Sequence, residues 1–497
     1  MSLGKFWRAN RVYLMVFAAL VALSLVGWKA MGQQSFVRTA LSGLTLGALY
    51  FMVAAGLTLI FGLMDVLNFA HGATFMIGAY MGWQFYTNPT FLFGVAPLVI
   101  ALIAGLVVSP LVQPYAMRWP VPMRLQKGLR VGLAILAVVL IVVGAVGLDI
   151  RGLAKTAMVA TMTANDPLAE ATPQEPLGAF WFRPTLFFIA GLLLALAQAR
   201  PGDRTQVVRP GRMVRNIVAL VLMLALMIVA TLLREPASIA VLKMNADLRF
   251  FMSLAVGALL GGALGAAIEV SLVRPLYVRP TFLILGTMGL AFVLREVVQL
   301  LWDPLPYAMS RPPLFSQPGK AASIGEWFTS HSITVDIMGV TFPSYRLFII
   351  ALGLLMIVML MIVMNYSRLG MTIRAGVQDR EMVEALGINV RKIFTLVFAL
   401  GAALAALGGI GAAPFVPVEP VMGDRYQMQG FITVVIGGMG SYSGAAIGAF
   451  LLGLARAFGD FLALKFSLTP AVSEASTVII MVLVLLLKPA GLFGKKE

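Results

Sequence analysis

The stretch that decides the fold is NYSRLGMTIRAGVQDREMVEALGINVRKI, residues 365–393. It is polar, carries charges of both signs, and lies between two long apolar segments near residues 344–364 and 393–413. A connection that only reverses the chain at a membrane surface needs little polar structure, whereas this one is long enough for an amphipathic helix with flanks. We therefore predict a membrane protein with a docking helix outside the bilayer.

The composition also places the chain in a membrane. Hydrophobic residues make up 60% of the 497 residues and charged residues 12%, whereas soluble domains carry about 45–50% and about 25%. The apolar runs are continuous rather than alternating, which indicates helices and not the strands of a barrel. The sequence therefore predicts an all-α polytopic membrane protein.

The apolar segments give the expected helices. Most reach the roughly 17–25 residues that span a bilayer, so we expect about 13 transmembrane helices. A further run at residues 427–438 is short, and we expect a re-entrant or half helix there, buried in protein, or a span. The longest polar connection, residues 302–343, is expected outside. The segments lie near residues 12–31, 39–62, 69–86, 94–113, 131–148, 180–199, 216–233, 250–272, 282–301, 344–364, 393–413, 443–463 and 471–488.

The net charge of +16 follows this topology. Lys and Arg concentrate in alternate loops, as they do on the cytoplasmic side of membrane proteins, so the charge indicates orientation and not a nucleic-acid ligand. Both termini are expected to be cytoplasmic. The apolar run at residues 12–28 is long for a signal peptide and no small-x-small cleavage site follows it, so residues 1–36 are expected to hold an uncleaved signal-anchor helix.

The sequence offers no catalytic, metal or cofactor site. It has no cysteine and two histidines, which argues against disulfides, thiolate chemistry and Cys or His metal clusters. No GxxxxGK[ST] motif occurs, so the chain cannot hold ATP phosphates by itself. Energy for transport must come from an ion gradient or from a partner chain.

Two helix breaks are candidates for a solute path. In GLTLIFGLMDVLNFAHGATFMIGAYMG, residues 56–82, two apolar segments meet at the polar residues Asp65, Asn68 and His71. In VIGGMGSYSG, residues 435–444, glycines favour the end of a short helix, a tight turn and a closely packed next helix. Transporters often expose backbone polar groups to substrate at such breaks. A packing role without substrate contact remains open for both.

Five charged residues lie within or near the apolar segments, where charges are costly and often functional. Arg456 and Asp460 are four residues apart, so they can pair on one helix face. Glu269 is expected near an inner helix end, where solvation is easy. These charges either fix the fold as pairs and snorkelling helix ends or couple transport to ions. The five residues are Glu269, Arg295, Glu296, Arg456 and Asp460.

Five blocks together resemble the permeases of the branched-chain (hydrophobic) amino-acid ABC importer family. With the helices between them they cover residues about 37–92 and 248–494, in the family's order. The blocks are AAGLTLIFGLMDVLNFAHGATFMIGAY (54–80), IEVSLVRPLYVRP (268–280), YSRLGMTIRAGVQDREMVEALGINVRKIFTLVFALGAALAALGG (366–409), VVIGGMGSYSGAAIGAFLLGLA (434–455) and LLLKPAGLFG (485–494).

The resemblance implies a set of partners. A periplasmic solute-binding protein delivers the solute, two permease subunits form the path, and two cytoplasmic ABC ATPase subunits drive it. The second permease is expected to be a different chain. Membrane lipid surrounds the permease, which lies in the bacterial inner membrane and is a transport subunit rather than an enzyme.

The resemblance also implies that residues 374–387 form the cytoplasmic coupling helix, which Gly387 would end. Charged residues would form its wet face, and Met382, Val383 and Leu386 would enter a groove of the ATPase. The residues expected to couple to the ATPase are Arg374, Asp379, Glu381, Met382, Glu384, Leu386 and Gly387.

The chain is longer than the family pattern. Residues 37–92 and 248–497 correspond to the permease core, while residues 1–36 and a four-helix membrane module at residues 93–247 are additional. The module either faces lipid or binds another subunit.

Aliphatic amino acids, above all branched-chain ones, are the expected solutes. Urea or short amides, which related permeases carry, are the alternative, and an ion-gradient-driven secondary transporter is the rival class. The residues expected to line the path are Asn68, His71, Gly437, Gly438 and Ser441.

Overall fold

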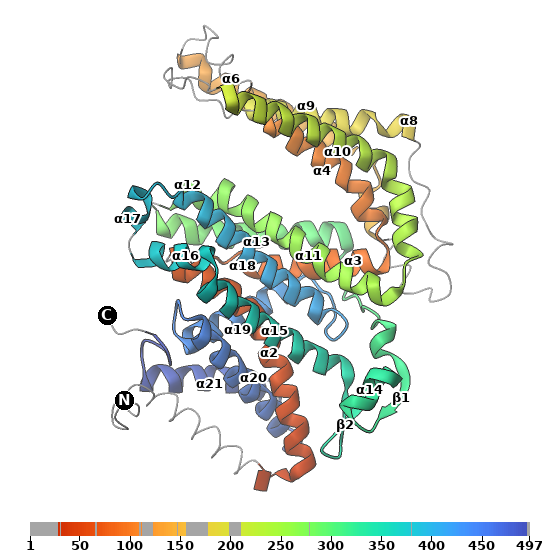
Figure 1. Cartoon of the computed structure of the whole chain (residues 1–497), viewed down its shortest axis with the longest axis vertical. Helices are drawn as coiled ribbons and strands as arrows, with labels where there is room; N and C mark the ends of the chain where they lie inside the picture. The colour runs from red at the N-terminus through yellow and green to blue at the C-terminus, as the bar shows by residue number, and fades with distance from the viewer. Residues whose placement is uncertain are drawn as a thin grey trace. The chain divides into compact units, whose positions relative to one another are not determined.

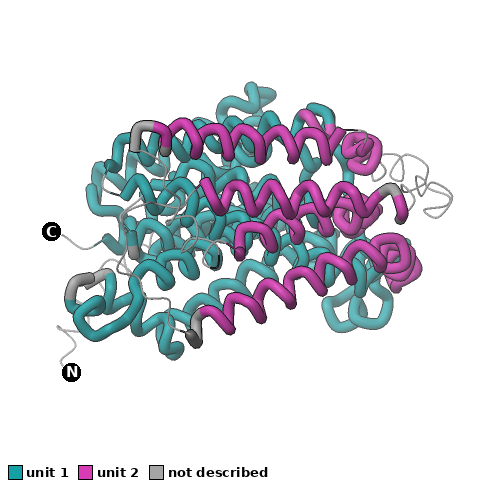
Figure 2. The backbone as a smooth tube through the Cα atoms, turned by 90° about the horizontal axis from the view of Figure 1, so that it is seen from above, with its two compact units in different colours: residues 1–83, 246–299, 303–497 teal, residues 84–245, 300–302 magenta. Residues whose placement is uncertain are grey.

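The computed structural model describes residues 28–29, 31–64, 67–108, 111, 123–146, 148–155, 177–197, 210–277, 279–378 and 380–494. It divides into two compact units (Figure 2). Unit 1 holds residues 1–83, 246–299 and 303–497, and unit 2 holds residues 84–245 and 300–302. Most of the helix expected within residues 1–36 lies outside the described residues.

The all-α polytopic class is confirmed. Within the described residues, nine helices are long and apolar enough to cross a membrane, and helices dominate the chain (Figure 1). Two shorter apolar helices, Phe182–Ala197 and Ala471–Leu487, add to them. The total of about 13 transmembrane helices stays a prediction.

The helix α2, Gln33–Met64, forms the centre of unit 1. In its most apolar stretch 83% of the residues are buried, so it is surrounded by protein rather than lipid. It packs against α15 (Ser344–Tyr366), α18 (Val390–Ala412), α19 (Met422–Gly437) and α20 (Tyr442–Lys465). Other helices of unit 1 are α3 (His71–Thr87, ending in unit 2), α16 (Arg368–Gln378), α17 (Arg380–Ala385) and α21 (Ala471–Leu487).

Small residues bring these helices into close contact, as is usual in membranes. A Cβ atom on Gly453 of α20 would lie 2.3 Å from the backbone nitrogen of Gly47 in α2. On the other side of the core, α11 (Ala246–Ile268) packs along α18. There a Cβ atom on Gly261 would lie 2.2 Å from that of Ala406.

Beyond α11 the chain changes its helical repeat. A π-helical segment, η1 (Glu269–Val273), leads into α12 (Arg274–Leu276) and then into α13 (Pro280–Trp302). Such π-helical turns often mark functional positions in helices.

The polar connection after α13 is a small folded layer, which the sequence analysis did not anticipate. Strand β1 pairs in parallel with β2, and β2 pairs antiparallel with β3. Phe315 is buried and stacks on Trp327 at a ring distance of 5.4 Å. The elements are η2 (Pro313–Phe315), β1 (Gln317–Ala321), α14 (Ile324–Ser330), β2 (Ser332–Ile337) and β3 (Val340–Pro343).

Unit 2 contains four long helices among the described residues. Helix α9 packs against α4 and α6, and α4 also packs against α10. Gly105 and Gly191 let α4 and α9 touch, since a Cβ atom on Gly191 would lie 2.2 Å from the backbone oxygen of Leu102. The helices are α4 (Thr90–Val107), α6 (Met123–Ala145), α9 (Phe182–Ala197) and α10 (Pro210–Leu242), with the short α8 (Leu177–Phe180).

Buried arginines hold parts of unit 2 together. Arg183 donates hydrogen bonds of 2.8 Å to the backbone oxygens of Gly144 and Val146, at the end of α6. The guanidinium of Arg234 lies 4.0 Å from the ring centroid of Phe180. In contrast, only 11% and 6% of the most apolar stretches of α6 and α10 are buried within the chain, which leaves broad apolar faces suited to lipid.

Candidate functional site

Helix α3 begins inside the core of unit 1 and not at its edge. The Nε2 atom of its first residue, His71, lies 3.2 Å from the backbone oxygen of Val53. Val53 belongs to α2, which ends at Met64, so α3 starts about 16 Å before that end, at 1.5 Å per residue. Asn68 and Ala70, which precede α3, are buried.

Helix α19 begins beside the same point. A Cβ atom on Gly72 would lie 2.2 Å from the backbone oxygen of Gly423, so the first turns of α3 and α19 touch. The Nε2 atom of Gln427 donates a 3.3 Å hydrogen bond to the backbone oxygen of Asn68. The 16 residues of α19 extend about 24 Å, which is shorter than the roughly 30 Å core of a bilayer. Two short helices thus start from one polar centre.

This centre has unused hydrogen-bonding capacity. The Nδ2 atom of Asn68, the Nδ1 atom of His71 and the Oε1 atom of Gln427 have no hydrogen-bond partner among the described residues. Asn68 is 2% exposed and His71 is fully buried. The Oδ1 atom of Asn68 accepts a 3.0 Å hydrogen bond from the backbone N–H of Ala70, which orients the amide. Buried polar atoms without partners are costly, so a water or a solute group would be favourable here.

The second break, the turn between α19 and α20, is filled by protein. Gly438 has a φ angle of 98°, and a Cβ atom there would lie 2.3 Å from the backbone nitrogen of Gly494. The backbone N–H of Phe493 donates a 3.0 Å hydrogen bond to the oxygen of Gly437. Ser441 is the N-cap of α20. The C-terminal segment therefore closes this turn.

The five residues expected to line one path are not brought together. Asn68 and His71 lie at the start of α19, whereas Gly437, Gly438 and Ser441 lie at its far end, about 20 Å away along the helix. The short helix expected at 427–438 starts earlier, at Met422. This start could not be recognised in the sequence, because the first turns of α19 are polar and contain no apolar run.

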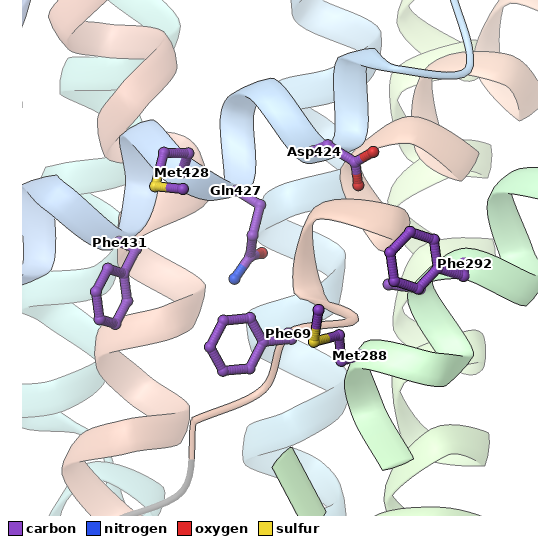
Figure 3. Close-up of a pocket in the computed structure, with 8 residues that line it drawn as sticks. Phe69, Met288, Phe292, Asp424, Gln427, Met428 and Phe431 are labelled. Carbon is purple, nitrogen blue, oxygen red and sulfur yellow. The ribbon is translucent and has the colours of Figure 1, made fainter. Parts of the chain in front are cut away.

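A pocket of about 260 Å³ opens beside the polar centre (Figure 3). Figure 3 shows the amide of Gln427 directed into the space between Phe69 and Phe431. Residues from α13, from α19 and from the segment before α3 form its walls. They are Phe69, Met288, Ala291, Phe292, Asp424, Gln427, Met428 and Phe431.

An ion pair joins the two helices at one end of this pocket. Arg295 of α13 donates a 2.8 Å hydrogen bond to Asp424 of α19. The side chains of Arg295 and Asp424 are 25% and 56% exposed, and Glu296 lies 3.6 Å from the same guanidinium. Arg295 and Glu296 were predicted from the sequence as intramembrane charges. Asp424 was not predicted, because only the tertiary structure shows that α19 contacts α13.

Glu269 is fully buried, so its expected place at a solvated helix end is wrong. Its carboxylate accepts hydrogen bonds from Arg274 at 2.7 Å, Tyr277 at 3.0 Å and Thr395 at 2.8 Å. Thr395 lies near the start of α18, the helix that follows α17. The network therefore ties the π-helical turn to the helix next to the expected coupling segment.

The expected pairing of Arg456 with Asp460 is confirmed, at a distance of 3.7 Å. The same guanidinium also lies 3.5 Å from Glu474 on α21. These charges link α20 to α21, which is a structural role for them.

The segment expected to couple to an ATPase consists of two short helices, α16 (Arg368–Gln378) and α17 (Arg380–Ala385), where the sequence predicted one helix at 374–387. After α17 the backbone N–H of Gly387 donates to the oxygen of Glu384, and Gly387 has a φ angle of 77°. This left-handed residue ends the helix because glycine adopts such angles without steric cost.

Two apolar side chains project from this segment. Met382 is 59% and Leu386 is 72% exposed, and their spacing of four residues places them on one side of the segment. Val383, expected to enter a partner's groove, is only 3% exposed and faces the core of the permease instead. The expectation for Val383 is therefore wrong.

The polar residues expected to couple to an ATPase have different positions. Arg374 donates a hydrogen bond to the backbone oxygen of Met364, which attaches α16 to the end of α15. Glu384 is exposed. Asp379 and the side chain of Glu381 lie outside what the structure describes.

The family model described as "Branched-chain amino acid transport system / permease component" matches residues 214–487. The chain belongs to this permease family. No solved structure matches the chain.

Curated relatives agree with this family. The permease is 30% identical over 245 residues to the high-affinity branched-chain amino acid transport system permease protein LivH of Escherichia coli K12, covering 49% of the chain and 74% of the relative. It is 30% identical over 256 residues to BraD of Pseudomonas aeruginosa, covering 51% and 77%. The fructose import permease protein FruF of Bifidobacterium longum is 26% identical over 248 residues, covering 48% and 63%.

Proposed function

We propose that this permease is the transmembrane subunit of an ATP-binding-cassette importer and moves branched-chain amino acids across the bacterial inner membrane. The observation that carries the proposal is the 30% identity to LivH over 74% of that relative's length, together with the ordered sequence blocks. A protein without a phosphate-binding loop needs a separate ATPase.

The proposed partners are two cytoplasmic ABC ATPases, a second permease of different sequence and a periplasmic solute-binding protein. The exposed pair Met382 and Leu386 supports an ATPase contact, because exposed apolar side chains beside a polar helix are typical of helix-in-groove docking. Both termini are proposed to be cytoplasmic, on the same side as α16 and α17, since the basic loops favour that orientation.

Residues 93–247 are proposed to be a membrane module added to the permease core and surrounded by lipid. Its support is the packing of α4, α6, α9 and α10 within their own unit and the apolar outer faces of α6 and α10. The family match runs from residue 214, within α10, to residue 487, so it leaves α4, α6 and α9 outside it, together with α2 and α3 of the proposed core.

The solute is proposed to pass the polar centre where α3 and α19 begin. Asn68, His71 and Gln427 offer hydrogen-bonding atoms there. Gly437, Gly438 and Ser441 are proposed to act at the path's cytoplasmic end, as a turn that the C-terminal segment holds closed.

Reconstitution tests the proposal. The complete importer is placed in proteoliposomes, and its binding protein is added on the side that the orientation of the importer requires. It should take up labelled leucine in an ATP-dependent manner. Competition with unlabelled valine, urea, acetamide and fructose should leave only the branched-chain amino acids effective. Uptake driven by a proton or sodium gradient without ATP would instead establish a secondary transporter.

A further inference from the structure

The pocket between α13 and α19 has one charged end and one apolar end. Asp424, Gln427, Met428 and Phe431 follow the spacing i, i+3, i+4, i+7, so they share one face of α19. Met288, Ala291, Phe292 and Arg295 repeat that spacing on α13. The ion pair between Arg295 and Asp424 marks the charged end, while Met288 and Phe431 lie away from it along the two faces.

The charged end contains donors and acceptors that are not fully used. Asp424 receives Arg295 through its Oδ2 atom, which leaves Oδ1 able to accept a hydrogen bond. The Oε1 atom of Gln427 has no partner among the described residues. The guanidinium of Arg295 has five N–H donors, and it lies 5.0 Å from the ring centroid of Phe292, a lining residue. An ammonium group suits the acceptors, and a carboxylate suits the guanidinium.

The backbone around the charged end is held in place. The backbone N–H of Phe69 donates a 3.3 Å hydrogen bond to the hydroxyl of Thr287 on α13. The Nε2 atom of Gln427 is fixed by the backbone oxygen of Asn68. With its nitrogen held on that side, the Gln427 amide leaves its buried oxygen without a hydrogen-bond partner among the described residues. The segment before α3, α13 and α19 are thus joined around the pocket before any ligand arrives.

The carboxylate of Asp424 is paired with Arg295 through one oxygen, but its exposed part favours water or a polar ligand, because charged groups in hydrocarbon are strongly disfavoured. Asp424 is 56% exposed in this chain. The volume of about 260 Å³ falls just below the roughly 300–1,000 Å³ of ordinary ligand pockets, which suits a small solute.

We propose that this pocket binds a zwitterionic aliphatic amino acid, with its carboxylate on Arg295, its ammonium on Asp424 and Gln427, and its side chain against Met288, Phe292 and Phe431. The inference rests on the proposed function and names the solute subsite within it. Urea and short amides carry neither the two charges nor the aliphatic group, so the pocket discriminates against them.

The absence of cysteine from the sequence allows a direct test on the complete importer. Ala291→Cys places one thiol in the pocket wall, and Thr329→Cys places one on the exposed helix α14 as a matched control. The complex is placed in nanodiscs of phosphatidylglycerol, and modification of this chain by N-ethylmaleimide is followed with and without L-leucine. At a leucine concentration about ten times its Kd, the Ala291→Cys labelling rate should fall about tenfold, and the Thr329→Cys rate should not change.

Further variants and ligands in the same labelling experiment test what occupies the pocket. Adding Asp424→Asn to Ala291→Cys should abolish the protection, while adding Arg425→Gln, an exposed neighbour on α19, should preserve it. Equal protection by urea or acetamide would overturn the assignment of a zwitterion. Protection by phosphatidylethanolamine nanodiscs, with none by leucine, would assign the charged end to a lipid headgroup and overturn it as well.

The inference and the proposed function can fail separately. If the importer takes up leucine with ATP but leucine does not protect Ala291→Cys, the pocket assignment is wrong and the proposed function stands. An importer that takes up no aliphatic amino acid would overturn the proposed function, whereas protection of Ala291→Cys by leucine in that importer would still support the pocket as an amino-acid site.

Discussion

The guanidinium of Arg295 donates a 2.8 Å hydrogen bond to the carboxylate of Asp424, a residue 129 positions later in the chain. This pair connects a long spanning helix, α13, to a short helix that begins within the core, α19. The two side chains remain 25% and 56% exposed within this chain, so the contact lies where water or a ligand can reach it and not in a closed core.

Replacing the exposed apolar pair of the coupling segment should uncouple transport. Met382→Ser with Leu386→Ser removes two side chains that a partner's groove would bury, each worth about 1.5–3 kcal/mol when fully buried. The affinity for the ATPase should fall by roughly tenfold or more for each side chain. Binding of purified ATPase to the permease in nanodiscs measures this change.

The matched control removes two exposed apolar side chains from the layer after α13. Ile324→Ser with Met338→Ser should leave ATPase binding unchanged. Unchanged binding in the Met382 and Leu386 variant would show that the ATPase docks elsewhere. Val383→Ala should instead lower the thermal stability of the permease, because Val383 is buried.

Close helix contact in the core predicts a sharp cost for an added methyl group. In Gly78→Ala the new Cβ atom would lie 2.4 Å from the Cα atom of Ala406, so α3 and α18 must separate, at about 1–3 kcal/mol. Gly289→Ala is the control, since nothing lies within 4 Å of its Cβ position. The midpoint of thermal unfolding in detergent should fall for the first variant only. Equal midpoints would argue against this helix contact.

The buried network of Glu269 predicts non-additive effects. Glu269→Gln weakens the hydrogen bonds from Arg274, Tyr277 and Thr395 and leaves Arg274 without its counter-charge, so we expect a loss of about 1–3 kcal/mol. Arg274→Gln should cost a similar amount. The double variant should lose less than the sum, because neither charge is then left alone. Thermal unfolding of all three variants measures the coupling, and strictly additive losses would contradict the network.

The layer after α13 should lose stability in acid. The hydrogen bond from Lys320 and, to a smaller extent, that from the backbone N–H of Gly339 hold the pKa of Asp336 below its usual value. A lowered folded-state pKa means that the stabilisation is present above the unfolded pKa of about 3.9. It is lost as the pH falls through the lower folded value.

Hydrogen exchange measures this effect directly. The protection factors of amides in β2 and β3 should decrease as the pH falls below about 4, and Asp336→Asn should show low protection at every pH. If the protection factors of the unchanged chain do not depend on pH, the Lys320–Asp336 pair does not stabilise this layer.

Much of the fold could be read from the sequence because its signals are local. Continuous apolar runs fixed the helical membrane class, and the position of Gly387 indicated where α17 ends. The spacing of Arg456 and Asp460 was enough to predict their ion pair. In each case the interacting groups lie within one or two helical turns, so spacing alone determines whether they meet.

The candidate site could be predicted only in part. Asn68 and His71 stand out as polar residues between apolar segments, but Gln427 and Asp424 lie in a polar stretch that carries no such contrast. Their partners come from α13 and from the segment before α3, far away in sequence. Val383 and Glu269 were misplaced for the same reason, since burial depends on which helices surround a residue.

The sequence by itself determined that this chain is a helical membrane protein of a permease family with a polar segment between two apolar helices. Hydropathy and charge act residue by residue, so they need no knowledge of the neighbours. Only the tertiary structure decided that α3 and α19 start from one polar centre, that Arg295 meets Asp424, and that the turn at Gly438 is closed by the C-terminal segment. These contacts depend on close backbone approach between helices, and that approach is fixed by packing across the whole core.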